Sequence, residues 1–449
     1  MKKIFSTALL LLIVAIAATA QSPKYVFYFI GDGMGPSHVW GAELLLKELD
    51  SKRRLSFTEF PTTAFVTTFS ASNGVTDSAA SGTALATGNK TNNGWLGMTP
   101  DGQPCYSVAK WAKDAGYAVG VSTTVPINHA TPGAFYAHQN SRNNYNEIAE
   151  EMRTSGYDFF AGGDPIYDEN RRAELYKTYE KSGYTIARGY RDFCNKSKDA
   201  ARIMLYQKDI ATQLPYAIDQ NDNDLNLAQI TEAGIEFLSR KSNKGFFFMI
   251  EGGKIDYASH SNDAATVMHE VEDFDAAIRV ALEFYNNHPD ETLIIVTADH
   301  ETGGLVLGYR SNYTLSIKRL EAQKCSEEKL GNILDEMYGN KKLNSCNELM
   351  ALLEQMMGIK ADEKQREEIN RLYSKVVDGD KEQSRKYMHR IANYASEIVS
   401  QESAISWASG NHSAAFVPLF AIGAGAERFN GVIDNTDIPK RINSIAEYK

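Results

Sequence analysis

Residues 24–33, KYVFYFIGDG, join a run of apolar side chains to a glycine turn that carries Asp32. A near-continuous apolar run is typical of a β-strand covered on both faces. Four more stretches share this pattern: YAVGVSTTV (117–125), GFFFMIEGG (245–253), LIIVTADH (293–300) and FVPLFAIGAG (416–425). Helical patterns lie between the predicted strands, at 108–115, 143–152, 227–241 and 263–287. This alternation predicts an α/β fold with a mainly parallel central sheet flanked by helices.

Acidic and histidine side chains lie at or just beyond the ends of these predicted strands. In a parallel sheet, ligands bind outside the carboxyl ends of the strands. Mixed carboxylate and imidazole ligands suit zinc, and positions with oxygen ligands alone suit magnesium. Any one of these residues could be a helix cap or a loop hydrogen-bonding group, but seven at one predicted edge favour a metal site. The seven are Asp32, Glu251, Asp256, His260, Asp299, His300 and His412.

The stretch VTDSAASGTALATG (75–88) places Asp77 and Ser78 side by side before small residues that indicate a helix start. Both side chains are good helix caps, and capping is the commonest role of such residues. A serine at a helix N-terminus also lies where anions such as phosphate are favoured, so Ser78 is also a candidate nucleophile. This stretch alone does not decide between the two roles.

The N-terminus and the charge limit the location and the partners. Lys2 and Lys3 precede an apolar run over 4–17, and Ala18-Thr19-Ala20 has the form of a cleavage site, so we expect a signal peptide at 1–20 and a periplasmic or secreted protein. No later run is long and apolar enough to predict stable membrane insertion. Without Lys2 and Lys3 the chain has 45 basic and 57 acidic residues, a net charge of about −12, which argues against nucleic acid as a partner.

Four cysteines, Cys105, Cys194, Cys325 and Cys346, are an even number in a chain predicted to be exported, so disulfides are allowed. Three pairings are open, and Cys325 with Cys346 is the first expectation because both lie in one helical segment. None of the four has the spacing of a zinc site.

The domain organisation follows from a change in pattern near residue 305. Residues 21–304 and 406–449 are expected to form the α/β catalytic core, in two parts. Residues 305–405 contain charged amphipathic runs, such as EEKLGNILDEMYGN, that predict one helical insertion in this core.

Six motifs, in order along the chain, make the sequence resemble the alkaline phosphatases, the metal-dependent phosphatases with a serine nucleophile. They are GDGMG (31–35), TDSAASGTALATG (76–88), ATPGAFYAHQNSR (130–142), EGGKIDYASH (251–260), TADHETGG (297–304) and NHSAAFVP (411–418). The resemblance implies hydrolysis of small-molecule phosphate monoesters by an alkaline-phosphatase-like fold, and it allows a homodimer.

The resemblance also implies three metal positions and two catalytic residues. It implies one zinc ion held by Asp256, His260 and His412, a second zinc ion held by Asp32, Asp299 and His300, and one magnesium ion held by Asp32, Thr131 and Glu251. Ser78 matches the nucleophile, and Arg142 matches the arginine that grips the phosphate.

These residue types fit the implied chemistry. A serine hydroxyl is a weak nucleophile until it is activated, and a nearby zinc ion lowers its pKa. The planar guanidinium of Arg142 can hold two phosphate oxygens at once. We therefore expect attack by Ser78, a phosphoserine intermediate and its hydrolysis.

The sequence departs from the family pattern at two site positions and in one segment. His129 stands where some members carry Asp, and an imidazole there is a softer potential ligand, which leaves magnesium occupancy open. Tyr257 stands where some members carry Lys or His, which removes a potential cation near the phosphate; Tyr157 lies far from any motif. The N-terminal arm that some members use in dimer contacts is expected to be absent.

Three other functions are weighed against a monoesterase. A sulfatase needs a C/S-x-P-x-R segment, which Ser78-Ala79-Ala80-Ser81-Gly82 lacks. Diesterases of the related group usually lack equivalents of Arg142 and of the magnesium site. A non-catalytic phosphate-binding protein would have lost a ligand or the nucleophile, and none is lost.

Overall fold

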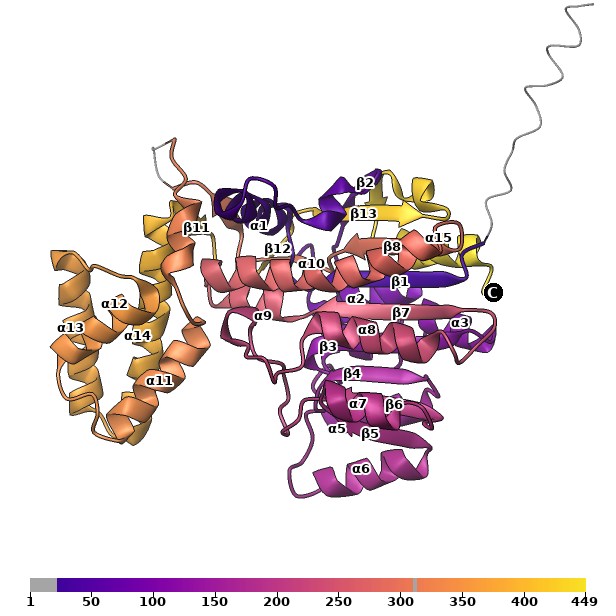
Figure 1. The fold of residues 1–449 in the computed structure, drawn as a ribbon, viewed down its shortest axis with the longest axis horizontal. Helices are drawn as coiled ribbons and strands as arrows, with labels where there is room; N and C mark the ends of the chain where they lie inside the picture. The colour runs from indigo at the N-terminus through magenta and orange to yellow at the C-terminus, as the bar shows by residue number, and fades with distance from the viewer. Residues whose placement is uncertain (1–21, 310–312) are drawn as a thin grey trace, which may run out of the picture.

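A computed structural model describes residues 22–309 and 313–449, and its centre is a ten-stranded sheet (Figure 1). The predicted signal peptide at 1–20 lies outside the described residues. The strands, in their order across the sheet, are β14 (Gly431–Asp434), β2 (Thr62–Thr67), β13 (Val417–Gly423), β8 (Thr292–Thr297), β1 (Tyr25–Gly31), β7 (Phe246–Gly252), β3 (Ala118–Pro126), β4 (Phe159–Gly163), β6 (Arg202–Tyr206) and β5 (Tyr184–Arg188).

Strand β13 runs antiparallel to both of its neighbours, and the other pairs in this sheet are parallel. The predicted fold class, a mainly parallel sheet flanked by helices, is therefore confirmed. All five strands expected from apolar runs are present; β2, β4, β5, β6 and β14 are additional.

Helices cover both faces of the sheet, with α8 and α10 packed together on one face and α2, α3 and α15 on the other (Figure 1). The helices flanking the sheet are α1 (Pro36–Leu49), α2 (Ser78–Thr87), α3 (Val108–Asp114), α4 (Ala130–Gly133), α5 (Tyr145–Thr154), α6 (Arg172–Lys181), α7 (Tyr190–Lys196), α8 (Leu227–Leu238), α9 (Lys254–His260), α10 (Ala264–Asn287) and α15 (Asp437–Ala446). Short 3-10 turns are η1 (Ser56–Glu59), η2 (Ala217–Asp219), η3 (Ile317–Ala322) and η4 (Ala426–Phe429).

Strand β1 shows why the apolar run becomes a central strand. Successive side chains of a strand point to opposite faces, so Phe27 and Phe29 share one face and Tyr28 takes the other. Phe29 packs edge-on against Phe274 of α10, and Tyr28 packs against Phe135 on the opposite side. Because both faces of the strand are buried, side chains on both faces are apolar, and the sequence of the strand is continuously apolar.

The register of the central strands brings the site residues to one edge. Ile30 of β1 lies beside Glu251 of β7 on one side and beside Thr297 of β8 on the other. The three strands are parallel, so their carboxyl ends come together, and Asp32, Glu251 and Asp299 emerge side by side.

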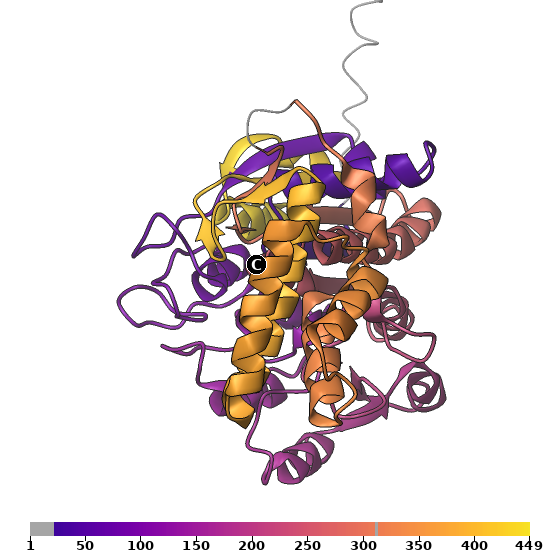
Figure 2. The ribbon, with the colours of Figure 1, turned by 90° about the vertical axis from the view of Figure 1, so that its left-hand side faces the viewer.

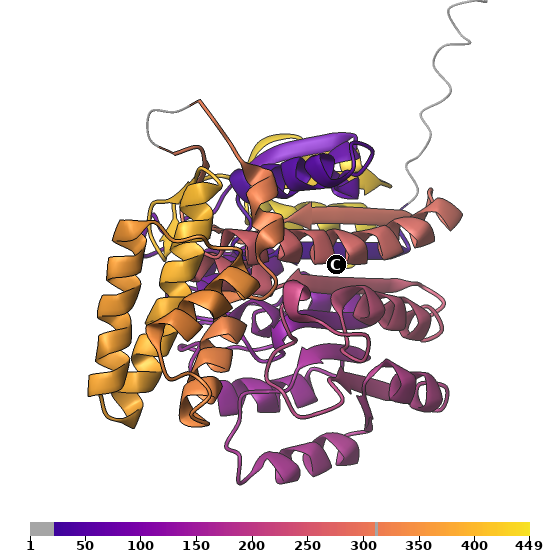
Figure 3. The ribbon, with the colours of Figure 1, turned by 60° about the vertical axis from the view of Figure 1, so that its left-hand side comes forward.

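The segment between β10 (Leu305–Leu307) and β11 (Ile405–Trp407), two strands that pair antiparallel, contains four long helices. They are α11 (Glu327–Gly339), α12 (Cys346–Met357), α13 (Glu363–Asp378) and α14 (Lys381–Glu402). Figures 2 and 3 show these helices standing together as a separate layer beside the α/β core. We refer to α11–α14 as the helical layer.

The helical layer is attached to the loop that follows α9. Asn393 donates to the Ser261 carbonyl at 3.3 Å, and Ser400 donates to the Asn262 carbonyl at 3.4 Å. Asp263 accepts from the Glu327 backbone N–H at 2.8 Å. The layer therefore holds the chain next to His260, the last residue of α9.

The expected Cys325–Cys346 disulfide is wrong, because all four cysteines are free. Cys325 is buried just before α11, whereas Cys346 begins α12. Sharing one helical segment does not bring two side chains together when the helices fold back on one another. Among the described residues, no helix combines the length and the apolar character needed to cross a membrane.

Candidate active site

Ser78 is the first residue of α2, and its side chain is buried against the carboxyl edge of the sheet. The helix cap is Asp77, whose carboxylate accepts a hydrogen bond from the Ala80 backbone N–H at 3.0 Å. The Ser78 hydroxyl instead lies 3.1 Å from Nε2 of His300. The sequence left helix capping and a role in the active site as alternatives for Ser78. In the structure, Asp77 caps the helix and Ser78 faces the site.

Asp256, His260 and His412 form a first cluster, with ligand atoms within 4.8 Å of one another. Asp256 and His260 lie on α9, and His412 lies on the short strand β12 (His412–Ser413). Nδ1 of His260 faces the Gly410 carbonyl at 2.6 Å, and Nδ1 of His412 faces the Thr76 carbonyl at 2.8 Å. A carbonyl only accepts, so each Nδ1 carries a proton.

The two Nε2 atoms of this cluster consequently face each other at 3.3 Å, beside the Asp256 carboxylate. Two imidazole lone pairs that converge at this distance repel unless a cation lies between them. Without one, the hydrogen bond to Asp256 raises the pKa of His260 to about 9, because a proton then supplies the positive charge. The donor set and its orientation fit a metal ion such as zinc.

Asp32, Asp299 and His300 form a second cluster, and all three are fully buried. Nε2 of His300 lies 3.3 Å from Asp32 Oδ1 and 3.3 Å from Asp299 Oδ2. Burial holds the pKa of His300 well below its usual value, so the ring is neutral. The rings of His300 and His412 stack with centroids 3.5 Å apart, which places the first and second clusters side by side.

A third cluster joins Asp32 and Glu251 to His129, a position at which the sequence departs from the family pattern and offers a softer potential ligand. Thr131, which the resemblance implied as a ligand, lies 3.5 Å from Asp32 Oδ2 and 3.5 Å from Asp299 Oδ2 through its Oγ1. The Glu251 carboxylate also accepts a hydrogen bond from the Thr123 hydroxyl. Two threonine hydroxyls therefore contact the carboxylates of the third cluster: that of Thr131 lies near Asp32, and that of Thr123 donates to Glu251.

The third cluster has unmet bonding capacity that a cation would use. Asp32 Oδ1 and Glu251 Oε1 are buried and have no hydrogen-bond partner among the described residues. Burial and the neighbouring carboxylates raise the pKa of Glu251 to about 8 and that of Asp299 to about 7. Buried like charges are costly unless something positive compensates them. The residues present therefore fit bound metal ions.

Arg142 reaches this edge from the loop after α4. Its Nη1 donates to Asp77 Oδ2 at 3.0 Å, and its Nη2 lies 3.0 Å from Nε2 of His129. The guanidinium is thus held between the neighbour of Ser78 and the third cluster, with about a quarter of its side chain exposed. A partly exposed cation in this position can meet an incoming anion.

Tyr257 follows Asp256 and packs its ring edge-on against His129, with centroids 5.8 Å apart. It therefore lines the side of the third cluster. Sequence reasoning did not identify Asp77 as the partner of Arg142, or Thr123 and Thr302 as neighbours of the clusters. Threonine carries no sequence signal for such a role, because it is common in every buried strand.

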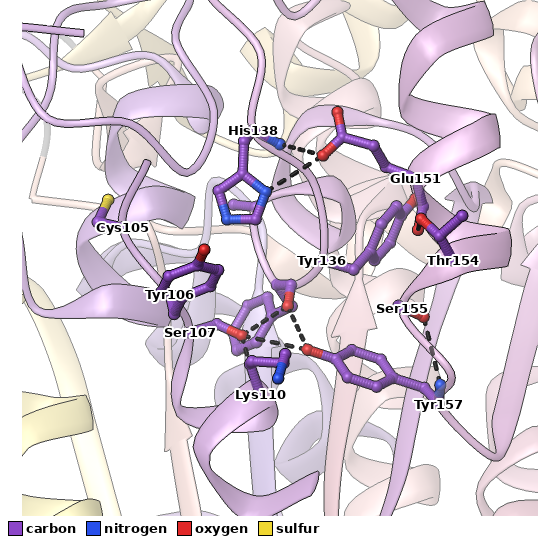
Figure 4. Close-up of a pocket in the computed structure, with 12 residues that line it drawn as sticks. Cys105, Tyr106, Ser107, Lys110, Tyr136, His138, Glu151, Thr154, Ser155 and Tyr157 are labelled. Atoms are coloured by element: carbon purple, nitrogen blue, oxygen red, sulfur yellow. Dashed lines mark hydrogen bonds and ion pairs between the residues drawn. The ribbon is translucent and has the colours of Figure 1, made fainter. Parts of the chain in front are cut away.

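A separate cavity of about 160 Å³ lies between Cys105, His138, Glu151 and Tyr157 (Figure 4). Its polar groups already pair with one another. Glu151 accepts from the His138 backbone N–H at 2.8 Å, and the Ser107 and Tyr157 hydroxyls both donate to the Phe135 carbonyl. The cavity contains none of the cluster residues.

The comparisons with known proteins agree with one another. A family model described as alkaline phosphatase matches residues 23–169 and 168–448. Alkaline phosphatase 4 of Bacillus subtilis (strain 168) is 32% identical over 433 residues, which cover 92% of this chain and 87% of that protein. The chain belongs to the alkaline phosphatase family, and it is a phosphomonoester hydrolase.

Two solved structures add to this likeness. A cold-active alkaline phosphatase from the psychrophile Shewanella sp. has 30% identity and a TM-score of 0.81, covering 94% of this chain and 99% of that one. A variant of the alkaline phosphatase from the Antarctic bacterium TAB5, in which a histidine is replaced by glutamate, has magnesium bound in its M3 site. It is 26% identical, with a TM-score of 0.68, and covers 96% of this chain and 99% of that one.

Removal of metal should destabilise the folded chain, because the buried carboxylates of the clusters then face one another uncompensated. Zinc at about 100 times its dissociation constant stabilises a one-site protein by about 2.7 kcal/mol. We expect the unfolding temperature of chelator-treated protein to rise when zinc is added, as measured by differential scanning calorimetry.

The matched variants are Asp256→Asn, in the first cluster, and Asp335→Asn, at an exposed ion pair in the helical layer. The first should lose part of the zinc-induced rise, and the second should keep all of it. An unfolding temperature that zinc leaves unchanged in the wild type would show that these clusters do not hold the ion.

Proposed function

We propose that the chain hydrolyses phosphate monoesters through a phosphoserine formed on Ser78. The observation that carries the proposal is the position of the Ser78 hydroxyl at the start of α2, 3.1 Å from Nε2 of His300 in the second cluster. The free N–H groups at a helix start favour the negative charge of a phosphoryl group. Nucleophile and anion site thus coincide.

The reaction balances in two displacements. The Ser78 hydroxyl gives up its proton as its oxygen forms a bond to phosphorus; the bond to the ester oxygen breaks, and that oxygen takes up a proton and leaves as the alcohol. Water then attacks phosphorus, the bond to the Ser78 oxygen breaks, and inorganic phosphate leaves while Ser78 regains its proton. Such transfers need mainly positioning and stabilisation of charge.

Arg142 supplies the positioning in this proposal. Asp77 and His129 hold its guanidinium in place, and the planar fork can then bind two phosphate oxygens. Because a monoester has one more free, charged oxygen than a diester, this grip favours monoesters.

We propose two zinc ions and one magnesium ion as the cofactors. Asp256, His260 and His412 would hold one zinc ion, and Asp32, Asp299 and His300 the other; Asp32, Thr131 and Glu251 would hold magnesium. When bound, such ions lower the pKa of an attacking hydroxyl and stabilise a leaving oxygen. His129 adds an imidazole to the third cluster, so magnesium should bind there less strongly than it would among oxygen ligands alone. A variant of the TAB5 alkaline phosphatase, in which glutamate replaces a histidine, has magnesium bound in its M3 site.

We also propose that the chain is exported to the periplasm or secreted. The support is the pattern at 1–20, two lysines followed by an apolar run and a small-residue cleavage site.

The phosphoserine can be trapped. Incubation with labelled phosphate at acid pH, followed by peptide mapping, should place the label on Ser78. Ser78→Ala should take up no label and should lose monoesterase activity by roughly 10³-fold or more, because the nucleophile is gone. Label on another residue of the wild type would contradict this assignment.

The role of Arg142 separates monoesterase from diesterase activity. Hydrogen bonds to a charged group contribute about 1.5–3 kcal/mol each. Arg142→Ala should therefore lower kcat/KM for a monoester by roughly 10²-fold or more, and for a diester much less. Arg142→Lys, which keeps the charge without the fork, should recover only part of the loss. Equal losses on both substrates, with an unchanged circular dichroism spectrum, would show that Arg142 is structural.

We propose a homodimer that uses an apolar groove of about 600 Å³ between α1, β2, β13 and the edge strand β14. Trp40, Phe65 and Val432 line it and are 52%, 53% and 68% exposed. Contiguous apolar surface of this kind marks interfaces. A second copy is the occupant that we infer, since a two-fold axis packs the same apolar residues against themselves.

Light scattering after size-exclusion chromatography tests the dimer. The wild type should have the mass of two chains, and Trp40→Glu should have the mass of one. Val377→Glu, at a 55% exposed residue of α13 outside the groove, should remain dimeric. A monomeric wild type at micromolar concentration would overturn the proposal.

A further inference from the structure

Thr302 lies between the first and second clusters. It is fully buried on the short strand β9 (Glu301–Thr302). Its Oγ1 lies 2.5 Å from Asp256 Oδ1, in the first cluster, and 3.2 Å from His300 Nδ1, in the second. One hydroxyl thus contacts a candidate ligand of each cluster.

The direction of these two hydrogen bonds follows from counting protons. A hydroxyl has one proton to donate, and an ionised carboxylate can only accept. A carboxylate that binds a cation is ionised, so the Asp256 oxygen accepts in its hydrogen bond with Thr302. Thr302 therefore donates to Asp256, and its oxygen accepts from N–H of His300 Nδ1.

This arrangement selects one tautomer of His300. With the proton on Nδ1, the lone pair lies on Nε2, the atom that faces Asp32, Asp299 and the Ser78 hydroxyl. A metal ligand needs that lone pair, and the group bonded to the other ring nitrogen is what fixes it.

His300 differs in this respect from the other two histidines. Nδ1 of His260 and Nδ1 of His412 are held by the backbone carbonyls of Gly410 and Thr76. Nδ1 of His300 is held by a side chain. Among these three rings, only that of His300 can therefore lose its Nδ1 partner by a substitution that changes one side chain.

The surrounding backbone holds Thr302 in place. Its N–H donates to the Gly33 carbonyl at 3.1 Å, and β9 pairs with β12, where it lies opposite His412. A Cβ atom on Gly33 would come within 2.9 Å of both Thr302 Oγ1 and Asp256 Oδ1. The glycine turn after β1 thus leaves room for the Thr302–Asp256 hydrogen bond.

We propose that Thr302 is a positioning residue that couples the two candidate zinc sites, by orienting Asp256 in one and setting the tautomer of His300 in the other. The inference rests on the proposed metal chemistry, and it adds a residue that touches neither substrate nor metal. Loss of the hydroxyl frees one oxygen of Asp256 and leaves the buried N–H of His300 without an acceptor.

Zinc affinity, measured by competition with a chromophoric chelator, tests this inference without relying on turnover. Thr302→Val keeps the shape and removes the hydroxyl, and Thr302→Ser keeps the hydroxyl. Thr231→Val, on α8, is the matched control, because that buried threonine donates only to the Leu227 carbonyl. We expect Thr302→Val to bind zinc roughly 10- to 100-fold more weakly at both sites. Thr302→Ser and Thr231→Val should stay within a few fold of the wild type.

Turnover at saturating zinc gives a second readout. Thr302→Val should lower kcat with little change in KM, because the ring beside Ser78 is misplaced while Arg142 still binds phosphate. Thr302→Ala, which has less bulk, takes the place of Thr302→Val if the valine variant does not fold.

Three results would overturn parts of this account, and they are distinguishable. Equal zinc affinity in Thr302→Val and the wild type would refute the coupling. Equal losses in Thr302→Val and Thr302→Ser would show that the role is packing rather than hydrogen bonding. A wild type that binds fewer than two zinc ions would refute the proposed metal chemistry itself, whatever the variants do.

Discussion

The site is built around the burial of three carboxylates at one point. Asp32, Glu251 and Asp299 leave the ends of β1, β7 and β8, three adjacent parallel strands, and all are inaccessible to water. Neighbouring negative charges in a protein interior repel strongly, since the low dielectric screens them little. The arrangement is stable only with protons or cations among them. The sheet register brings the carboxylates together, so positive charge nearby stabilises them. Metal ions can supply that charge, and so can the guanidinium of Arg142 at the third cluster.

The imidazole rings near these carboxylates are held in fixed orientations. Each of the three histidines of the first and second clusters has one ring nitrogen bonded to a fixed acceptor, either a backbone carbonyl or the Thr302 hydroxyl. The other nitrogen is left to face the carboxylates. Holding rings this way limits rotation before any ligand arrives, and such preorganisation lowers the cost of binding. The guanidinium of Arg142 is also fixed in orientation, because it donates hydrogen bonds to Asp77 and to His129.

The helical layer contributes to the site by position rather than by ligands. Its helices bond to the loop at 261–263, directly after His260, through Asn393, Ser400 and the start of α11. That loop directly follows α9, the helix that carries Asp256. The helical layer thus stabilises the less buried side of the first cluster, where His260 is exposed.

The local sequence determined five of the ten strands of the central sheet and the candidate site residues near their ends. A strand buried on both faces must be apolar throughout, so the runs at β1, β3, β7, β8 and β13 are visible without a structure, and so are the acids and histidines at their ends. The edge strand β14 and the short β2, whose outward side chains are partly exposed, lack that continuous pattern. They were not predicted for this reason.

Only the tertiary structure decided which groups meet. That Asp77 caps α2 while Ser78 faces His300, that His129 joins Asp32 and Glu251, and that Cys325 stays apart from Cys346 are all questions of distance between side chains. Thr302 reaches Asp256 across 46 positions of the chain. Side-chain type and spacing constrain what a residue can bond to along its own element. The partner across the fold is selected by strand order, register and the space that Gly33 leaves open, none of which is a local property of the sequence.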